Sequence, residues 1–381
     1  MDKKEAKRTV RVFALASFLN DFGSDMIYPI WPLFLTAFLG ANMAVLGFID
    51  GLGDAVVSVS QAVSGYWSDK IRKRKVFIWT GYLFGGLSRI GYALSTSWHY
   101  VVPFRILDRS GKIRNAPRDA IIADISEKKG MGRNFGILRA FDNLGAVAGI
   151  LTSVLLFGLI GYKKLFLIAA VPSFIGAIML LFYIKERKTK IKIGKGISFK
   201  DLSPNFKLFL LASSFFALGS FSYSFLLVYA QQVGFKAALI PVLYLIFTAV
   251  AFLFSYPFGK FSDKIGRKSV IFISFAFWLV ACVVFAFTQS YLFIVIAFVF
   301  YGLYKSAFET VQRAFVAELA PVRFRASTLG GFQMVIGLIA LPASIFAGVL
   351  WVNVNMFAPF YFSIGLTIAS MVILMFVKET N

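Results

Sequence analysis

The sequence predicts an all-α membrane protein with twelve transmembrane helices in two pseudo-symmetric six-helix bundles, and three observations lead to this prediction. The first is composition: 59% of the 381 residues are hydrophobic and 15% are charged, whereas soluble domains are nearer to half apolar and a quarter charged. The second is a regular succession of apolar runs, each of about the 20 residues that a helix needs to cross a bilayer. The third is an internal duplication of the chain.

The apolar runs divide the chain into twelve expected helices. The first six are expected over residues 10–38, 43–68, 75–95, 99–125, 134–160 and 164–184. The second six are expected over residues 206–232, 238–262, 269–288, 291–319, 327–351 and 357–377. A basic stretch separates the two sets, so we expect an N-terminal bundle over 1–184, a cytoplasmic linker over 185–205 and a C-terminal bundle over 206–381.

The duplication is visible as a motif that recurs at a constant shift of 194 residues. The first copy comprises Gly65, Ser68, Asp69, Lys70 and Ile71, and the second comprises Gly259, Ser262, Asp263, Lys264 and Ile265. The same shift relates Ala120 to Ala314, Asp124 to Glu318 and Gly136 to Gly330. Two similar halves are typical of membrane transporters.

The formal net charge of +22 comes largely from short Lys and Arg clusters between the apolar runs. In an alternating topology these clusters fall on one side, with Lys163 and Lys164 as the exception. Because basic loops stay in the cytoplasm, we expect both termini to be cytoplasmic and the protein to be a multi-pass protein of the cell membrane. The partners expected from this pattern are membrane lipids rather than nucleic acid.

Cysteine and histidine are scarce, with Cys282 and His99 as the sole examples. A disulfide framework or a thiolate metal site within one chain is therefore excluded, and we expect no metal and no cofactor. The basic N-terminus precedes an apolar stretch that is too long for a signal peptide, so we interpret it as a retained first helix. Nucleotide-binding and hydrolase motifs are absent from the sequence, which argues against a pump or an enzyme.

The segment GKFSDKIGRK, from Gly259 to Lys268, resembles the signature loop between the second and third helices of each half in the major facilitator superfamily. The first-half copy, GYWSDKIRKRK, has Arg72 in place of the second glycine. The stretches 18–35 and 105–124 resemble a largely uncharacterised prokaryotic subfamily of these transporters. The resemblance implies a monomeric secondary transporter in which helices 1, 4, 7 and 10 line a central cavity and helices 3, 6, 9 and 12 face outward.

The resemblance also implies that the signature loops act as a cytoplasmic gate, in which Asp69 and Asp263 pair with basic groups or cap a neighbouring helix. The candidate gating residues are Gly65, Asp69, Lys70, Lys73, Gly259, Asp263, Lys264, Gly266 and Arg267. The alternative is a charge cluster that serves only to orient the helices during insertion.

Ionisable residues within the expected spans are costly and therefore call for a reason. Two acidic pairs, Asp21 with Asp25 and Asp50 with Asp54, are spaced i, i+4 and have no basic residue one turn away. Two carboxylates one turn apart cannot both ionise cheaply in a low dielectric. We therefore predict that these four residues are candidates for proton coupling, the alternative being a permanent salt-bridge network across helices 1, 2 and 4.

Charged residues of the fourth and tenth expected helices are candidates for substrate binding. The set comprises Arg105, Arg109, Lys112, Lys305 and Glu309. Some deep charges can instead pair along their own helix, as Glu309 can with Lys305 and Asp142 with Arg139. The fifth helix contains GAVAG, from Gly145 to Gly149, which resembles the glycine motif of drug–proton antiporters although Ile150 replaces its proline.

These features predict a secondary active transporter that moves a small organic solute by alternating access, with proton coupling and with efflux slightly favoured. The alternatives are a uniporter or uptake carrier for an anionic solute, and a solute receptor that does not transport. A channel fits the two-fold repeat and the deep carboxylates less well. Substrate identity, direction of transport, coupling mode and stoichiometry, and oligomeric state are open at this stage.

Overall fold

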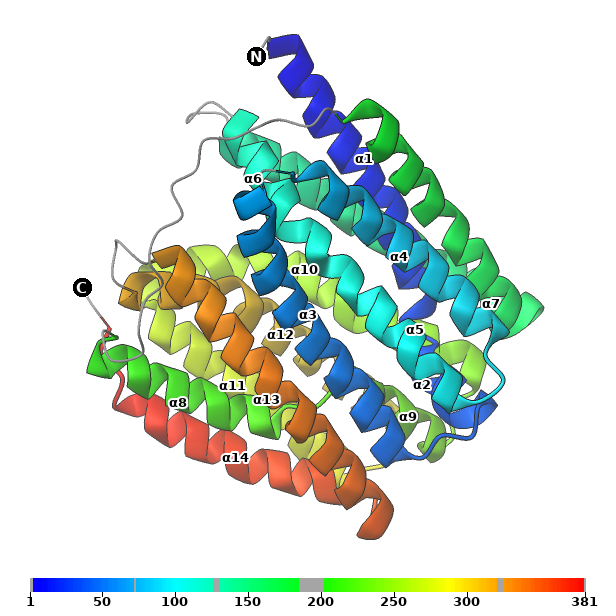
Figure 1. Cartoon of the computed structure of the whole chain (residues 1–381). Helices are drawn as coiled ribbons and strands as arrows, with labels where there is room; N and C mark the ends of the chain where they lie inside the picture. Colours follow the sequence, from blue (N-terminus) through cyan, green and yellow to red (C-terminus); the bar gives the residue numbers. More distant parts are fainter. Residues whose placement is uncertain (1–2, 72, 126–130, 185–201, 321–324, 380–381) are drawn as a thin grey trace. The chain divides into compact units, whose positions relative to one another are not determined.

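The computed structural model describes residues 3–71, 73–125, 131–184, 202–320 and 325–379 (Figure 1). The helices up to residue 183 are α1 (Lys3–Ile27), α2 (Trp31–Leu33), the π-helical turn η1 (Phe34–Phe38), α3 (Met43–Ile71), α4 (Lys75–Leu94), α5 (Trp98–Ser110), the 3-10 turn η2 (Gly111–Arg114), α6 (Asn115–Ile125) and α7 (Met131–Tyr183). The later helices are α8 (Pro204–Gly219), α9 (Tyr223–Val233), the 3-10 turn η4 (Ala237–Leu239), α10 (Ile240–Ile265), α11 (Arg267–Phe287), α12 (Tyr291–Leu319), α13 (Arg325–Asn353) and α14 (Ala358–Met375). Within the described ranges these helices group into twelve spanning segments at the positions predicted from the sequence.

Three of the twelve segments are interrupted. The first breaks after α1, where Pro29 lacks the N–H that a continuing helix needs. The fourth passes through η2 between α5 and α6, and the seventh breaks at residues 220–222 between α8 and α9. In contrast, α7 contains two spans in succession, separated at Gly161, whose φ of 69° and ψ of −175° lie outside helical values.

Eight stretches of the described residues are long and apolar enough to cross a membrane. One of them, Ile137–Tyr183, covers two of the expected spans. The expected spans that fall short all lie in the first half, at residues 10–38, 75–95 and 99–125. Each carries deep charges, such as Asp21, Arg89 and Arg105. These charges lower the mean hydropathy of the three segments, and they are also the residues that call for a functional or structural explanation.

The chain forms two compact units, and one helix contributes to both. The first unit comprises Met1–Gly40 and Val56–Gly194, and the second comprises Ala41–Ala55 and Lys195–Asn381. The helix α3 therefore begins in the second unit and ends in the first. The expected linker over 185–205 lies mostly outside the described residues, so the domain boundaries drawn from the sequence stay a prediction.

Each unit has its own core. In the first unit α1 and α4 pack against α7, around buried residues such as Phe13, Tyr82 and Leu138. In the second unit α12 packs against α10 and α11, and α8 packs against α13 and α14. The first half of α3 lies against α13 so closely that a Cβ at Gly51 would be 2.7 Å from the Leu341 Cα atom. Small residues permit this backbone contact.

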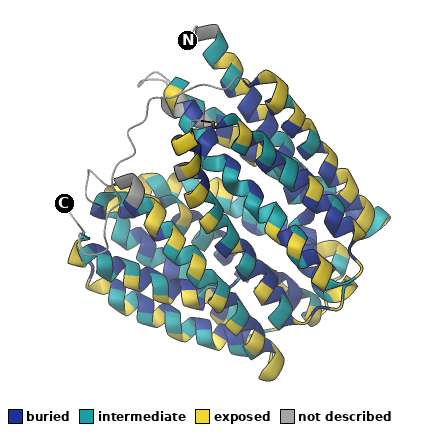
Figure 2. Ribbon diagram, in the orientation of Figure 1, coloured by how far each residue is buried: buried dark blue, intermediate teal, exposed yellow. Residues whose placement is uncertain are grey.

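Large apolar side chains are exposed along the outer faces of the helices, as the yellow positions on α7 show (Figure 2). Leu159 on α7 is 81% exposed and Tyr256 on α10 is 78% exposed. In water such surfaces would be a liability. They suit helices that satisfy their own backbone hydrogen bonds and face lipid.

Candidate functional site

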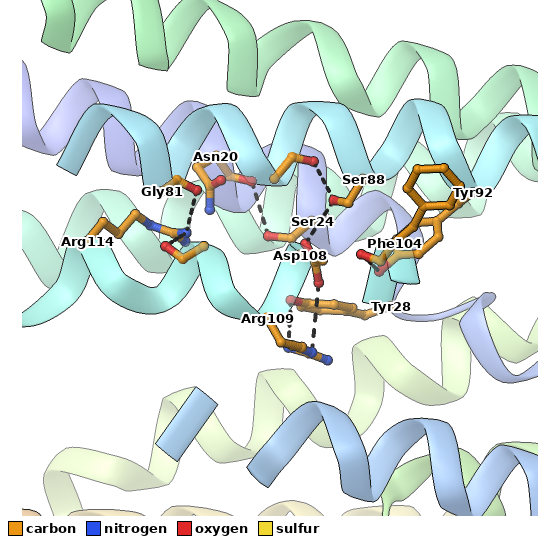
Figure 3. A network of polar contacts seen from close by, with 12 residues as sticks. Asn20, Ser24, Tyr28, Gly81, Ser88, Tyr92, Phe104, Asp108, Arg109 and Arg114 are labelled. Atoms are coloured by element: carbon orange, nitrogen blue, oxygen red, sulfur yellow. Dashed lines mark hydrogen bonds and ion pairs between the residues drawn. The ribbon is translucent and has the colours of Figure 1, made fainter. Parts of the chain in front are cut away.

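The interruption of the first span brings aromatic residues against the basic residues of α5. Arg109 donates a hydrogen bond from Nη1 to the Tyr28 hydroxyl at 3.2 Å (Figure 3), and its guanidinium carbon lies 5.2 Å from the centre of the same ring. Arg105 lies 4.4 Å from the centre of the Trp31 ring. Stacking on an aromatic face stabilises a cation that has left water. Two of the predicted substrate-binding residues are thereby placed together at the end of α1.

Asp108 lies within the same cluster. The Ser88 hydroxyl donates to its Oδ1 at 3.4 Å, and the Arg109 Nε is 3.8 Å from its Oδ2 (Figure 3). Between Arg105, Asp108 and Tyr92 there is a cavity of about 10 Å³, room for about one water molecule. The cluster is therefore closed around its charges in this conformation.

Arg89 has a different role from the basic residues of α5. Its side chain is 2% exposed, and it donates to the Ala169 carbonyl at 2.7 Å, to the Asn20 carbonyl at 3.1 Å and to the Ser173 hydroxyl. A Cβ at position 23 would collide with this guanidinium, which explains the glycine there. Arg89 thus ties α4 to α1 and α7 as a structural cation.

The two acidic residues of α1 have different neighbours. Asp21 accepts a hydrogen bond from Asn20 Nδ2 at 3.0 Å, and it lies within electrostatic range of Asp142 on α7. The backbone of Asp25 packs against Gly149 of α7, because a Cβ there would be 3.1 Å from the Asp25 carbonyl carbon. The backbone of Asp25 therefore lies at the α1–α7 interface.

Asp50 and Asp54 lie in the part of α3 that belongs to the second unit. Asp50 is 3% exposed and accepts a hydrogen bond of 2.7 Å from the Ser222 hydroxyl at the break of the seventh span. The Ser222 hydroxyl also accepts from the backbone N–H of Ser224 and so caps α9. Asp54 lies within electrostatic range of Tyr301, together with Lys305 and Glu309.

Lys305 and Glu309 form the pair along α12 that the sequence suggests, with Nζ and Oε1 3.8 Å apart. Their side chains are 33% and 67% exposed, so the pair contributes little to stability. Lys305 Nζ also lies 5.6 Å from the centre of the Phe247 ring. That ring packs edge-on against Tyr244 and Tyr301. The Lys305–Glu309 pair therefore lies beside the aromatic side chains of Phe247, Tyr244 and Tyr301.

Lys112 is the remaining substrate-binding candidate. It lies in η2, the 3-10 turn between α5 and α6, and is partly buried. The neighbouring Arg114 donates to the Gly111 carbonyl at 2.8 Å and to the Gly81 carbonyl at 3.4 Å (Figure 3). Its guanidinium carbon also lies 4.7 Å from the centre of the Tyr82 ring. Arg118 on α6 pairs with Asp119 at 3.0 Å. The fourth span therefore carries a continuous series of cations, of which Arg114 and Arg118 are held by structural partners.

The signature loops contain matching ion pairs that the sequence did not single out. Arg74 pairs with Asp124 at 2.6 Å in the first unit, and Arg267 pairs with Glu318 at 2.6 Å in the second. Asp124 and Glu318 are related by the 194-residue shift. Each pair joins the start of the third helix of a half to the end of the fourth.

The remaining gating candidates are placed as follows. Helix α3 continues through residues 65–71, but the surroundings of Gly65 and Asp69 lie outside the described part of the chain. Lys70 Nζ lies 5.2 Å from the centre of the Trp67 ring. Lys73, which follows the helix, is exposed. In the second loop Gly259 lies within α10, and Asp263 and Lys264 are exposed. Gly266 has φ of 94°, a backbone conformation that glycine adopts more readily than other residues. The Glu379 carboxylate accepts from the backbone N–H groups of Arg267 and Lys268, at the start of α11.

Sequence reasoning missed Tyr28 and Trp31 as members of the sites, and it included Ser222 only as one of several polar residues of the seventh helix. A signal was present, because the 194-residue shift relates Tyr28 to Ser222 and so relates the two helix breaks. Among the described residues no group of His, Cys, Asp and Glu is arranged to hold a metal ion. Cys282 is buried, with its sulfur 3.4 Å from the Ser363 hydroxyl.

Comparison with known proteins gives the family. The family profile described as Major Facilitator Superfamily matches residues 13–252 and 208–381. An uncharacterized MFS-type transporter of Methanocaldococcus jannaschii is 38% identical, over 98% of this chain and 96% of that protein. The multi-drug resistance efflux pump PmrA of Streptococcus pneumoniae is 26% identical over 70% of each chain. The class H tetracycline resistance protein of Pasteurella multocida is 23% identical over 73% of each chain.

Solved structures show the same fold. A mutant of the nucleoside transporter NupG superposes with a TM-score of 0.83 at 15% identity, over 97% of this chain and 100% of that chain. A POT family transporter in complex with a thioalcohol-conjugated peptide gives a TM-score of 0.76 at 13% identity, over 97% and 95%. The family profile, the archaeal relative and these superpositions agree, and the chain belongs to the major facilitator superfamily.

Proposed function

We propose that this transporter moves a small organic solute by alternating access, in exchange for protons and in the export direction. The observation that carries the proposal is the cluster at the break of the first span, where Arg105, Asp108 and Arg109 meet Tyr28 and Trp31. Cations stacked on aromatic rings offer both charge and an apolar face to a solute. Asp108 balances part of the positive charge while the cluster is closed.

Lys112 in the first unit, and Lys305 with Glu309 in the second, extend the proposed binding residues. The four carboxylates predicted from the sequence, Asp21, Asp25, Asp50 and Asp54, are the proposed proton-coupling groups. The relationship to an efflux pump and to a tetracycline resistance protein supports export. The signature-loop residues are proposed to gate the cytoplasmic side, with both termini in the cytoplasm of the cell and the protein acting as a monomer in the cell membrane.

The test uses the purified protein in liposomes that contain a pH-sensitive dye. Tetracycline, nucleosides and short peptides are added one at a time, and proton movement is recorded together with uptake of the labelled solute. Exchange predicts that a transported solute moves protons in the opposite direction, and that an imposed pH gradient accumulates the solute. The matched control variant is Arg109→Ala, which removes the cation that contacts Tyr28.

A second candidate function is uniport or uptake of an anionic solute, which the basic side chains of α5 favour. It predicts solute movement down its own gradient with no proton movement, and that result would overturn proton exchange. A protein that binds solutes in a thermal-shift assay but moves none of them would instead support a receptor.

A further inference from the structure

We propose that the first unit binds an anionic phospholipid in a cavity between the start of α1 and the ends of α6 and α7, with the phosphate of the head group against Arg8. The cavity has a volume of about 170 Å³, whereas one water molecule needs about 10–15 Å³. It is therefore large enough for a lipid head group. The site is separate from the α5 cluster, and it does not rest on the proposed transport function.

The walls of the cavity come from three helices. The start of α1 lies beside the end of α7 (Figure 1). The residues that line the cavity are Glu5, Arg8 and Thr9 of α1, Ile121 and Ile125 of α6, Phe182 and Tyr183 of α7, and Ile184. Ile121 and Ile184 are buried and give the cavity an apolar floor. The α1 residues add a cation, a carboxylate and a hydroxyl group, so the cavity is amphipathic.

Arg8 supplies the positive charge of the cavity. Its side chain is exposed, and its guanidinium carbon lies 5.5 Å from the centre of the Tyr183 ring. Contact with a ring face leaves the N–H groups in the plane of the guanidinium available, and these groups match the oxygens of a phosphate. Lys7 and Arg11 are exposed on the same helix and add to the positive potential. An anionic ligand is therefore favoured over a neutral one.

Glu5 and Thr9 restrict the kind of anion. The Thr9 hydroxyl donates to the Glu5 carbonyl at 3.0 Å, so its oxygen remains able to accept a hydrogen bond. The Glu5 carboxylate repels a phosphate but accepts hydrogen bonds from hydroxyl groups. A head group that carries hydroxyl groups as well as a phosphate satisfies both ends of the cavity. Phosphoglycerol, the head group of phosphatidylglycerol, has this chemistry.

The outer face of α7 indicates a lipid rather than a free anion in water. Large apolar side chains are exposed along it at residues 171, 175, 178 and 182, a spacing that places them on one face of the helix. The series ends at Phe182, which is 75% exposed and also lines the cavity. An acyl chain can therefore follow the exposed face of α7 while its head group occupies the cavity. Tyr183 lies at the boundary, where aromatic residues are favoured in membranes.

The experiment measures lipid retention by native mass spectrometry of the full-length protein in detergent, with phosphatidylglycerol or phosphatidylcholine added. We expect phosphatidylglycerol to be retained in preference to phosphatidylcholine, and Arg8→Ala to lower its affinity by about tenfold. Lys7→Ala is the matched control, because it removes an exposed cation of α1 that does not line the cavity; we expect it to change the affinity by less than about twofold. Ile125→Trp leaves every charge in place but fills the cavity, so it should also reduce retention. Circular dichroism checks that each variant folds.

Four results would overturn the proposal. Equal loss in Arg8→Ala and Lys7→Ala would mean diffuse attraction to a basic surface, and wild-type retention in Ile125→Trp would place the lipid outside the cavity. Equal retention of phosphatidylcholine would remove the role of the charge. If glycerol phosphate without acyl chains raised the melting temperature as much as phosphatidylglycerol did, the ligand would be a soluble anion.

Discussion

The two halves of this transporter place chemically different side chains at equivalent positions. The 194-residue shift pairs Arg105 with Val299 and Arg109 with Leu303. It likewise pairs Arg89 with Val283 and Asp142 with Ile336. Every one of these charges in the first half is replaced by an apolar residue in the second.

Aromatic side chains of the second half pack against one another. Phe216 stacks on Phe275 with centroids 3.9 Å apart, and Trp278 packs 5.3 Å from Tyr304. The break in the helix is retained in both halves, but Tyr28 meets Arg109 in one and Ser222 meets Asp50 in the other. The duplication therefore kept a helix break at equivalent positions, while the polar partners at each break differ.

Replacing the structural cation of the first half should have the largest effect. Arg89→Met keeps most of the side-chain volume but removes all donors to α1 and α7, so we expect a loss of about 2–4 kcal/mol of unfolding free energy. Val283→Met, at the equivalent and 41% exposed position, should change stability by less than about 0.5 kcal/mol. Thermal and denaturant unfolding in detergent measure both. Equal losses would mean that the two positions do not differ as described.

Removing the stacked cation should impair transport more than removing its apolar equivalent. Arg109→Ala is expected to lower kcat/KM for a transported solute about 10–30-fold, the equivalent of about 1.4–2 kcal/mol of lost interaction. Leu303→Ala shortens an apolar side chain of the second half and removes no charge. We therefore expect it to lower kcat/KM by less than about threefold. The measurement is initial transport rate in liposomes. A larger effect for Leu303→Ala would place the solute mainly against the second half.

The hydroxyl contacts at the two helix breaks should differ in strength. Ser222→Ala removes a 2.7 Å hydrogen bond to a carboxylate that is 3% exposed, at a cost of about 1–2 kcal/mol. Tyr28→Phe removes a 3.2 Å contact but keeps the ring under Arg109, at a cost of about 0.5 kcal/mol. The double variant Asp50→Asn with Ser222→Ala should recover part of the loss in unfolding experiments. Additive losses would show that the two groups are not coupled.

The signature-loop ion pairs should give the smallest and most similar effects. Asp124→Asn and Glu318→Gln each remove a 2.6 Å pair with an arginine, and we expect losses of about 0.5–1 kcal/mol that shrink at high salt. Asp263→Asn, at an exposed position of the same loop, serves as the control and should be nearly neutral. A loss confined to one half would show that the two loops have diverged in function as well as in sequence.

Much of the fold was predictable from the sequence, because a bilayer imposes a simple rule. A span needs enough apolar residues to cross the membrane, and the predicted spans coincide with the observed helical segments even where α7 joins two of them. The turn at Gly266 was predictable for a similar reason, since its positive φ suits glycine. Spacing also suggested the pairs Lys305–Glu309 and Arg139–Asp142, which are one turn apart on a helix.

The candidate site was less predictable, because its contacts join residues that are distant in the chain. Asp21 and Asp25 are one turn apart, yet Asp21 also lies within electrostatic range of Asp142 on α7 and of Lys112 in η2. Arg89 and Arg105 are both deep arginines, yet one binds backbone carbonyls and the other stacks on Trp31. Helical periodicity gives the face of a helix on which a residue lies but not the helix that covers that face.

The sequence by itself determined the membrane class, the twelve spans, the duplication and the family, because each depends on composition or on short local patterns. The tertiary structure decided which partners each buried charge has, because the energy of a buried ion depends on the donors and charges that packing brings within a few ångströms. For Arg89 and Asp50 these partners come from other elements, and the packing of those elements determines which groups each charge contacts.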